Sequence, residues 1–176
     1  MSELPVSAQL LADVRAGDRE ALSRLYRQYG DTVYRVAYRL TESSADAQDV
    51  TQDVFIALPE AIGSVRSPQS FEQWLKTVAV RTALMKLRWR RRRREVQLST
   101  VGQLAAHPLF RGGIDRLSLE RAMGQLPENL RSVFVLKEIE GFSHREIAEI
   151  LGISQRASES RLHRAREKLR LLLVTE

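Results

Sequence analysis

The chain has 176 residues, 28 of them Lys or Arg and 22 Asp or Glu, which gives a formal net charge of +6. The combination of 43% hydrophobic and 28% charged residues is typical of a chain that folds. The absence of cysteine excludes disulfides, thiolate zinc sites and cysteine catalysis. No apolar run reaches the roughly 18 residues of a membrane span, and the N-terminus lacks the apolar core of a signal peptide. We therefore expect a soluble, cytoplasmic protein with no direct membrane insertion and an anionic partner.

Charge and composition divide the chain into two units and a connecting segment. Residues 1–95 carry 16 bases and 12 acids, and residues 116–176 carry 11 bases and 9 acids. Residues 96–115 have one of each, contain Pro108 and the Gly112-Gly113 pair, and lack a sustained apolar period. Because no segment alternates as a strand does, we predict an all-α fold with two small helical domains, 1–95 and 116–176, joined by a flexible linker.

The first two helices of the N-terminal unit are predicted from apolar residues recurring every three and four positions. Asp18 is placed to cap the first run, which we expect to end at Gly30. Asp31 would then cap a second run that extends to Leu40.

Two more helices are predicted in this unit. One begins at Ser43 or Ser44, and we expect Pro59 to end or bend it. Residues 60–70 are rich in Gly, Ser and Pro and predict a loop. A long helix then runs from Phe71 into a basic tract.

The basic tract places seven Lys or Arg residues in the nine positions 86–94. Such a run is often a solvated tail or a localisation signal. Its continuity with an amphipathic, aromatic helix instead favours phosphate contacts in fixed geometry. Of the aromatic residues nearby, we expect Phe71 and Trp74 in the core and Trp89 exposed.

A helix-turn-helix is predicted near the C-terminus. Ser143 and Glu146 form a capping-box pattern, Gly152 permits a left-handed turn, and Ser154 can cap the next helix. That helix is long, with an apolar stripe on one side and many arginines on the other. A short helix, a glycine turn and a basic helix are typical of DNA binding, with residues 155–164 entering the major groove. The alternative is an antiparallel helical hairpin with a solvated charged face.

The sequence carries no signature of catalysis. The three histidines, His107, His144 and His163, are far apart, and there is no nucleophile–base pair, metal-ligand spacing or phosphate-binding glycine loop. We expect no enzymatic activity, no cofactor, no metal and no small-molecule substrate. His144 is expected on a helix surface and His163 on the DNA-facing side.

Five segments, in order and at matching spacing, resemble the extracytoplasmic-function (ECF, group IV) sigma factors of bacterial RNA polymerase, in the sigma-70 family. The matching segments are 46–55, 70–75, 126–131, 141–154 and 160–166. The resemblance implies a sigma-2 domain at 1–95, a sigma-4 helix-turn-helix domain at 116–176, and a linker threading toward the polymerase active-site cleft. It implies three partners: core RNA polymerase, contacted at the clamp helices of the largest subunit and at the flap; promoter DNA; and an anti-sigma factor.

The resemblance also implies three sets of contact residues. The core-polymerase contacts would be Asp49, Gln52, Asp53 and Phe55. The loop 62–70 would hold a flipped base of the minus-10 element, and the minus-10 contacts would be Ser64, Arg66, Ser67, Ser70, Lys86, Arg88, Arg90 and Arg91. The minus-35 contacts would be Arg156, Glu159, Ser160, Arg161, His163 and Arg164.

Two residues depart from the family pattern in the helix expected to read the minus-35 element. Ser158 stands where an apolar residue normally packs, and Glu159 stands where a base often contacts DNA. A carboxylate is repelled by phosphates but can accept a hydrogen bond from cytosine N4. The minus-35 preference is therefore unusual, or minus-35 binding is weak.

Two other functions compete with promoter recognition. One is a helix-turn-helix regulator that binds a palindromic operator as a dimer. The other is a sigma mimic that titrates an anti-sigma protein without starting transcription; the arginine tract argues against it, because a decoy needs no phosphate contacts. The sequence leaves open the regulated genes, the inducing signal and the identity of the anti-sigma factor.

Overall fold

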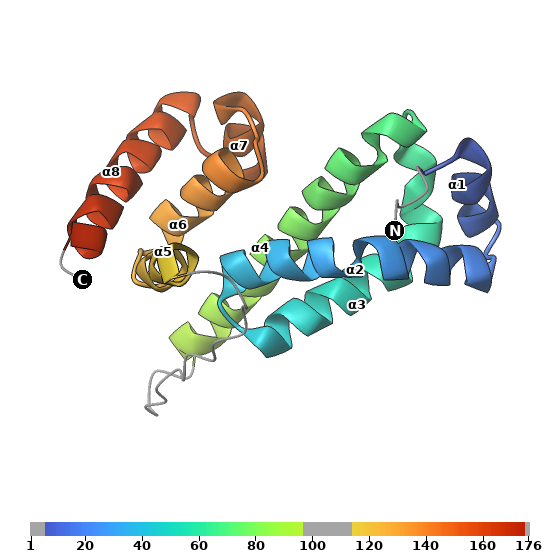
Figure 1. Cartoon of the computed structure of the whole chain (residues 1–176), viewed down its shortest axis with the longest axis horizontal. Helices are drawn as coiled ribbons and strands as arrows, with labels where there is room; N and C mark the ends of the chain where they lie inside the picture. Colours follow the sequence, from blue (N-terminus) through green and yellow to red (C-terminus); the bar gives the residue numbers. More distant parts are fainter. Residues whose placement is uncertain (1–5, 97–113, 175–176) are drawn as a thin grey trace. The chain divides into compact units, whose positions relative to one another are not determined.

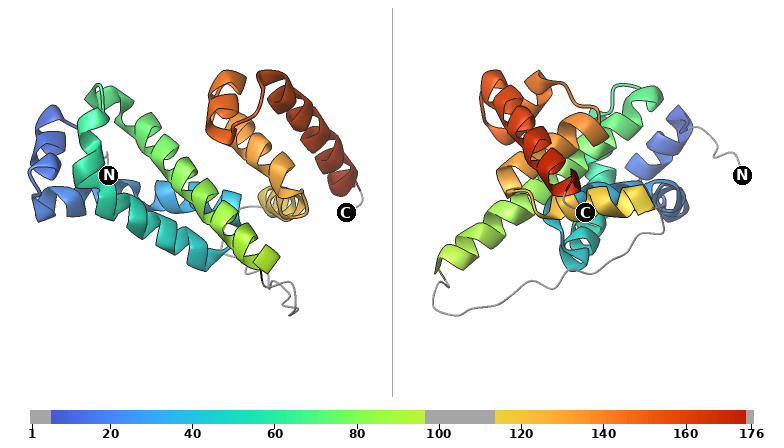
Figure 2. Two further views of the ribbon diagram at one scale, coloured as in Figure 1. Left: turned by 180° about the vertical axis from the view of Figure 1, so that it is seen from behind. Right: turned by 60° about the vertical axis from the view of Figure 1, so that its left-hand side comes forward.

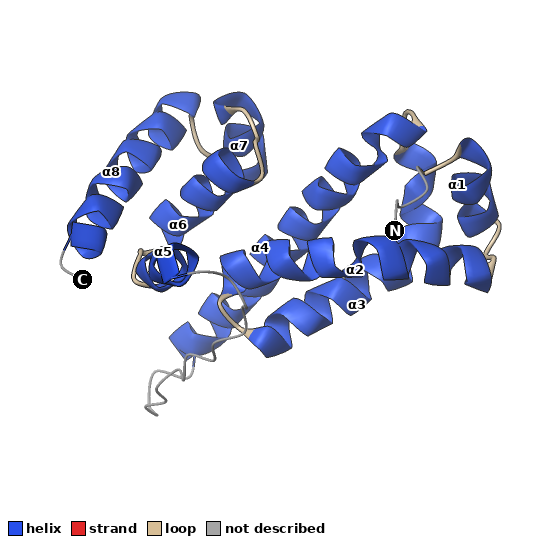
Figure 3. Ribbon diagram, viewed as in Figure 1, coloured by secondary structure: helices blue, strands red, loops and turns tan. Residues whose placement is uncertain are grey.

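The computed structural model describes residues 6–96 and 114–174, and the side chains of residues 6–93 and 118–173. Every regular element in these ranges is helical (Figure 3), which confirms the predicted all-α class. The chain divides into two compact units, Met1–Leu104 and Ala105–Glu176. Most of the segment expected to be a linker lies outside the described residues.

Unit 1 is a bundle built on three long helices (Figure 1). Its elements are α1 (Ala8–Arg15), α2 (Arg19–Thr41), α3 (Ser44–Ala61), the 3₁₀ turns η1 (Ile62–Ser64) and η2 (Pro68–Ser70), and α4 (Phe71–Val96). Helices α2, α3 and α4 pack against one another, and α1 packs against α2 and α3 (Figure 2). Leu25, Leu40, Leu58, Phe71 and Leu75 are fully buried between them. The position expected for Phe71 is confirmed.

Helix α2 runs without interruption through Gly30, so the expected break at that residue is wrong. The apolar positions on either side share one helical face, because Leu25 and Val33 are both buried and are separated by eight residues. The ring of Tyr26 lies across Gly30, 3.7 Å from where a Cβ would stand. Packing of this continuous face against α3 and α4 outweighs the low helix propensity of one glycine.

Helix α3 continues two residues beyond Pro59, so of the two expected effects, an end or a bend at the proline, the end is wrong. The helix closes with a backbone bond from Ile62 N to Leu58 O. A proline this close to the C-terminus removes one backbone donor and leaves the bonds of the last turn intact.

The sequence interpretation missed helix α1. The Ser7 hydroxyl accepts a hydrogen bond from Leu10 N at 3.1 Å and caps this helix. Leu10 and Val14, four residues apart, are buried. This short helix is stabilised by packing, because eight residues are too few for a helix to persist alone in water.

Between residues 114 and 174, unit 2 forms four helices and one π-helical turn. Its elements are α5 (Ile114–Gly124), α6 (Glu128–Phe134), the π-helical η3 (Val135–Ile139), α7 (His144–Leu151) and α8 (Gln155–Val174). Helices α5, α6 and α7 all pack against α8. Val133, Leu136, Phe142, Ile147 and Ala165 form the centre of this core. Each unit therefore has its own apolar interior.

Candidate interfaces for nucleic acid and protein

Three of the four residues expected to contact polymerase lie on one exposed face of α3. Asp49, Gln52 and Asp53 are three and four residues apart and open to solvent. Phe55 is only 5% exposed and meets Tyr26 edge-on, with ring centroids 5.0 Å apart. The next residue, Ile56, is 77% exposed. The structure thus gives Phe55 a packing position and presents Ile56, which the sequence interpretation missed, to solvent.

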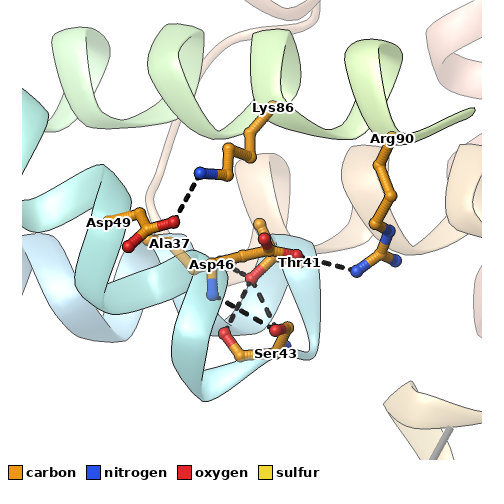
Figure 4. A network of polar contacts seen from close by, with 7 residues as sticks. All are labelled: Ala37, Thr41, Ser43, Asp46, Asp49, Lys86 and Arg90. Carbon is orange, nitrogen blue, oxygen red and sulfur yellow. Dashed lines mark hydrogen bonds and ion pairs between the residues drawn. The ribbon is translucent and has the colours of Figure 1, made fainter. Parts of the chain in front are cut away.

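Two ion pairs join α3 to α4 (Figure 4). Lys86 Nζ lies 2.6 Å from Asp49 Oδ2, and Arg90 NH1 lies 2.8 Å from Asp46 Oδ2. The hydrogen bond to Asp49 raises the pKa of Lys86 above its ordinary value. Both cations were expected to contact DNA, and both are half-buried against carboxylates of α3. They hold the basic end of α4 on the bundle.

A cap network fixes the acidic start of α3 beneath those cations (Figure 4). The Ser43 hydroxyl accepts from Asp46 N at 3.2 Å. The buried Thr41 hydroxyl donates to Ala37 O at 2.9 Å, at the end of α2. Because Asp46 is anchored through its own backbone, its carboxylate is held in place for Arg90.

The outer side of α4 combines exposed cations with an exposed aromatic ring. Trp89 is 51% exposed, which confirms the expectation. The Arg93 guanidinium carbon lies 4.1 Å from the centroid of the Trp89 ring, a cation–π distance. Arg88 and Arg91, both expected DNA contacts, are also exposed. A cationic surface with an accessible aromatic face is suited to nucleic acid.

The serines of the loop 62–70 are hydrogen-bonded within the loop or to the helices that flank it. The Ser64 hydroxyl donates to Ala61 O at 2.8 Å and accepts from Trp74 Nε1 at 3.0 Å. Trp74 is therefore half-buried and tied to the loop, rather than placed in the core as expected. Ser67 and Ser70 cap η2, with Ser67 N donating to Ser70 Oγ at 3.2 Å. These bonds leave the loop serines with partners inside the protein.

A groove of about 290 Å³ lies between α1 and this loop. Its walls are mostly apolar, and two arginines line it, Arg15 from α1 and Arg66 from the loop. The Arg15 guanidinium lies over Gly63, where a Cβ would be 3.5 Å from Arg15 Cζ. Arg66 is exposed. The sequence interpretation missed the groove because it missed α1.

In unit 2 the structure confirms the predicted helix-turn-helix, including the predicted caps of both helices. Ser143 Oγ accepts from Glu146 N at 3.2 Å, and Ser143 N donates to Glu146 Oε2 at 2.8 Å. The Ser143 hydroxyl also donates to Glu146 Oε2 at 2.7 Å, and this bond, followed by the one from Ser143 N, lowers the pKa of Glu146. Gly152 is left-handed, with φ 66°, and Ala157 N donates to Ser154 Oγ at 3.1 Å. Local residues thus fix both ends of the turn.

The first half of α8 presents a polar, largely cationic face. Of the six residues expected to contact the minus-35 element, Arg161 is half-buried and the others are exposed, namely Arg156, Glu159, Ser160, His163 and Arg164. On the opposite side Leu162, Ala165 and Leu169 are buried. This division leaves the polar face available to a partner.

The buried side of α8 contains one polar contact that the sequence interpretation did not foresee. Ser158 is 0% exposed, as its packing position predicted, and its Oγ lies 2.9 Å from Nδ1 of His144 on α7. His144 is half-buried rather than on the surface. A hydrogen bond at the crossing of α7 and α8 satisfies the hydroxyl where an apolar side chain would need none.

A further ion pair holds the second half of α8. Arg166 NH2 lies 2.6 Å from Glu138 Oε1 on η3. The pair joins α8 to the element before α7, so polar contacts hold α8 to both η3 and α7.

The described part of the chain contains no cluster of three His, Asp or Glu side chains that could hold a metal ion. Within the same residues, no helix has the length and apolar character needed to cross a membrane.

Comparison with protein families matches residues 25–95 to sigma-70 region 2 and residues 116–169 to sigma-70 region 4. The chain is 34% identical over 163 residues to the ECF RNA polymerase sigma factor SigE of Mycolicibacterium smegmatis, covering 88% of this chain and 63% of that protein. It is 30% identical over 167 residues to SigM of Mycobacterium tuberculosis, covering 94% of this chain and 84% of that one. It is 32% identical to the ECF RNA polymerase sigma-E factor of Escherichia coli, covering 96% of this chain and 95% of that one.

Two solved structures are similar over most of the chain. The sigma factor RpoE of Bartonella quintana, in complex with the anti-sigma factor NepR, is 25% identical with a TM-score of 0.65, covering 88% of this chain and 97% of that one. CnrH, in complex with the cytosolic domain of CnrY, is 28% identical with a TM-score of 0.58, covering 96% and 97%. The family is not enzymatic, in agreement with the absence of a catalytic pattern. With both sigma-70 regions present in order and relatives matched along most of its length, the chain belongs to the sigma-70 family as an ECF RNA polymerase sigma factor.

Proposed function

We propose that this sigma factor docks on core RNA polymerase through α3, reads the minus-10 element with the loop 62–70 and α4, and reads the minus-35 element with the first half of α8. In this scheme residues 1–95 and 116–176 are the two binding domains and residues 96–115 connect them. The observation that carries the proposal is the division of α8 into a buried apolar stripe and an exposed, mostly cationic face.

The exposed face of α3 is suited to a protein partner. Asp49, Gln52 and Asp53 would contact the clamp helices of the largest polymerase subunit, and Ile56 would supply the apolar anchor. Protein interfaces commonly combine a buried apolar centre with a polar rim. Phe55 would act indirectly, by packing α3 onto Tyr26.

The groove between α1 and the loop 62–70 has walls suited to an extruded base. Opening duplex DNA costs about 1.4 kcal/mol of stacking per step. An apolar pocket that captures one base, with cations near the adjoining phosphates, offsets part of that cost. Arg15 and Arg66 line the groove, and the outer cations of α4 would hold the backbone.

An anti-sigma factor is the third proposed partner. One of the similar solved structures is a sigma factor bound to an anti-sigma factor, and the other is CnrH bound to the cytosolic domain of CnrY. That supports an inhibitory partner for this chain, which would cover a surface needed for polymerase or DNA.

The test is run-off transcription with core RNA polymerase on a promoter library randomised at both elements. The full chain should enrich two short sequence elements among the transcribed templates. Asp53→Arg should reduce transcription from every template, whereas Asp31→Arg, at an exposed acid of α2, serves as the matched control and should not. Failure of the full chain to direct any transcription with core polymerase would overturn the proposal.

A further inference from the structure

Glu159 is the one acid within residues 155–164, the part of α8 proposed to enter the major groove. Its neighbours on the exposed face are cationic or polar. A carboxylate there is repelled by the phosphates of every duplex, whatever the sequence. It favours binding only where a base edge supplies a hydrogen-bond donor, so its position points to a role in discrimination.

A hydrogen bond from the same helix restrains the carboxylate of Glu159. Gln155 Nε2, one turn earlier, donates to Glu159 Oε1 at 3.2 Å. A carboxylate has about four acceptor sites, so this bond leaves capacity for a donor on DNA. The bond holds the carboxylate on the exposed side of the helix.

The donors in the major groove are cytosine N4 and adenine N6. Adenine carries its N7 acceptor beside N6, and that lone pair repels a carboxylate, whereas an amide can pair with both atoms. Cytosine presents its amino group without such an acceptor on the same base. We propose that Glu159 is a specificity-determining residue that accepts a hydrogen bond from cytosine N4 in the minus-35 element. This inference rests on the proposed reading of that element by α8.

The neighbours of Glu159 set the context of the cytosine. Arg156 lies three residues before it and His163 four residues after it, both exposed. Residues at these spacings share one side of a helix, so all three face the same stretch of groove. Arginine pairs best with guanine O6 and N7, so a guanine near the cytosine is expected. A good bidentate pair, such as arginine with guanine, discriminates about 5- to 150-fold.

The test uses the full chain with core polymerase on a library randomised only at the minus-35 element. The wild type should enrich cytosine at one position. Glu159→Gln should move the preference there from cytosine to adenine, and Glu159→Ala should remove it, while the other positions keep theirs. Glu128→Gln, the same charge change at an exposed residue of α6, is the matched control and should leave the element unchanged.

Three results would overturn the inference. Cytosine enrichment that persists in both Glu159 variants would do so, and so would a wild-type element that lacks an enriched cytosine. Transcription with no minus-35 enrichment at all would reject both this inference and the proposed role of α8. Failure of the inference alone is therefore distinguishable from failure of the proposed function. Run-off transcript from the fixed minus-10 element by each variant shows that the protein is folded and active.

Discussion

Lys86 and Asp49 are ion-pair partners across the α3–α4 interface, with 2.6 Å between Nζ and Oδ2. One was expected to contact promoter DNA and the other to contact polymerase. A substitution at either residue therefore changes the surroundings of the other. Loss of function after a change at one of them identifies a direct contact only when its partner has been tested too.

The first prediction separates the roles of these two residues. Asp49→Asn should weaken binding to core polymerase by about tenfold, which corresponds to about 1.4 kcal/mol, as expected for losing one charged contact. Lys86→Met should leave that affinity within about twofold, because it removes the ion-pair partner of Asp49 and keeps the Asp49 carboxylate. Competition binding with labelled core polymerase measures both. Equal losses in the two variants would show that the pair acts on binding through the shape of the bundle.

A double-mutant cycle on Asp46 and Arg90 is the second prediction. Their side chains are 17% and 27% exposed, so their ion pair is less screened than one on the open surface. We expect a coupling free energy of about 1 kcal/mol in urea unfolding. The pair Arg27 and Glu20 is the control, since its 2.9 Å contact is far more exposed and should give nearly none. Similar couplings for both pairs would contradict a contribution from burial.

The third prediction contrasts two neighbours on α3. Phe55→Ala should lower the free energy of unfolding by about 3–5 kcal/mol, because a buried aromatic ring is lost. Ile56→Ala should change it by less than about 0.5 kcal/mol and should weaken binding to polymerase. Chemical denaturation and the competition assay measure the two effects. A stable Phe55→Ala protein that fails to bind polymerase would assign Phe55 to the interface.

Gly30→Ala is predicted to stabilise the protein. The added Cβ would stand 3.7 Å from the Tyr26 ring, an ordinary contact, and Gly30 already has a helical conformation. Replacing a helical glycine with alanine contributes about 0.5–1 kcal/mol, which thermal unfolding can detect. Gly152→Ala is the opposite case, because φ 66° disfavours a side chain, and it should destabilise unit 2. A destabilised Gly30→Ala would mean that the ring of Tyr26 cannot adjust.

The last prediction concerns acid pH and the cap of α7. The pKa of Glu146 is lowered in the folded protein, so its contribution to stability is present above the unfolded value, about 4.3. It is lost as the pH falls through the folded value. Glu146→Gln keeps an acceptor for Ser143 N but has no charge to lose. Thermal unfolding at pH 7 and pH 3 should show that this variant loses less stability at acid pH than the wild type. Glu149→Gln, on the same helix, should behave as the wild type.

Features set by neighbouring residues could be predicted from the sequence. The cap at Ser143, the turn at Gly152 and the cap at Ser154 depend on side chains within a few positions, and all three are present. The break expected at Gly30 was wrong because a glycine lowers helix propensity locally, whereas tertiary packing of α2 outweighs that effect. Helix α1 was missed because its stability comes from packing.

Contacts between distant residues could not be predicted. Arg90 and Asp46 are 44 positions apart, and His144 and Ser158 are 14 apart. A periodic pattern shows which residues share a face, and it does not identify the partner across a helix interface. Phe55 is a different case, because its spacing from Thr51 and Leu58 already places it on the buried face of α3; only the family resemblance assigned it to polymerase.

The ion pair between Arg166 and Glu138 bears on how salt will affect DNA binding. Each phosphate that a protein neutralises releases condensed counterions, and the logarithm of affinity falls by about 0.9 per contact with the logarithm of salt concentration. Arg166 is already neutralised within unit 2. The salt dependence of DNA affinity should therefore be shallower than the full set of basic residues on α8 would give. Part of that positive charge is paired within unit 2 and stabilises the fold.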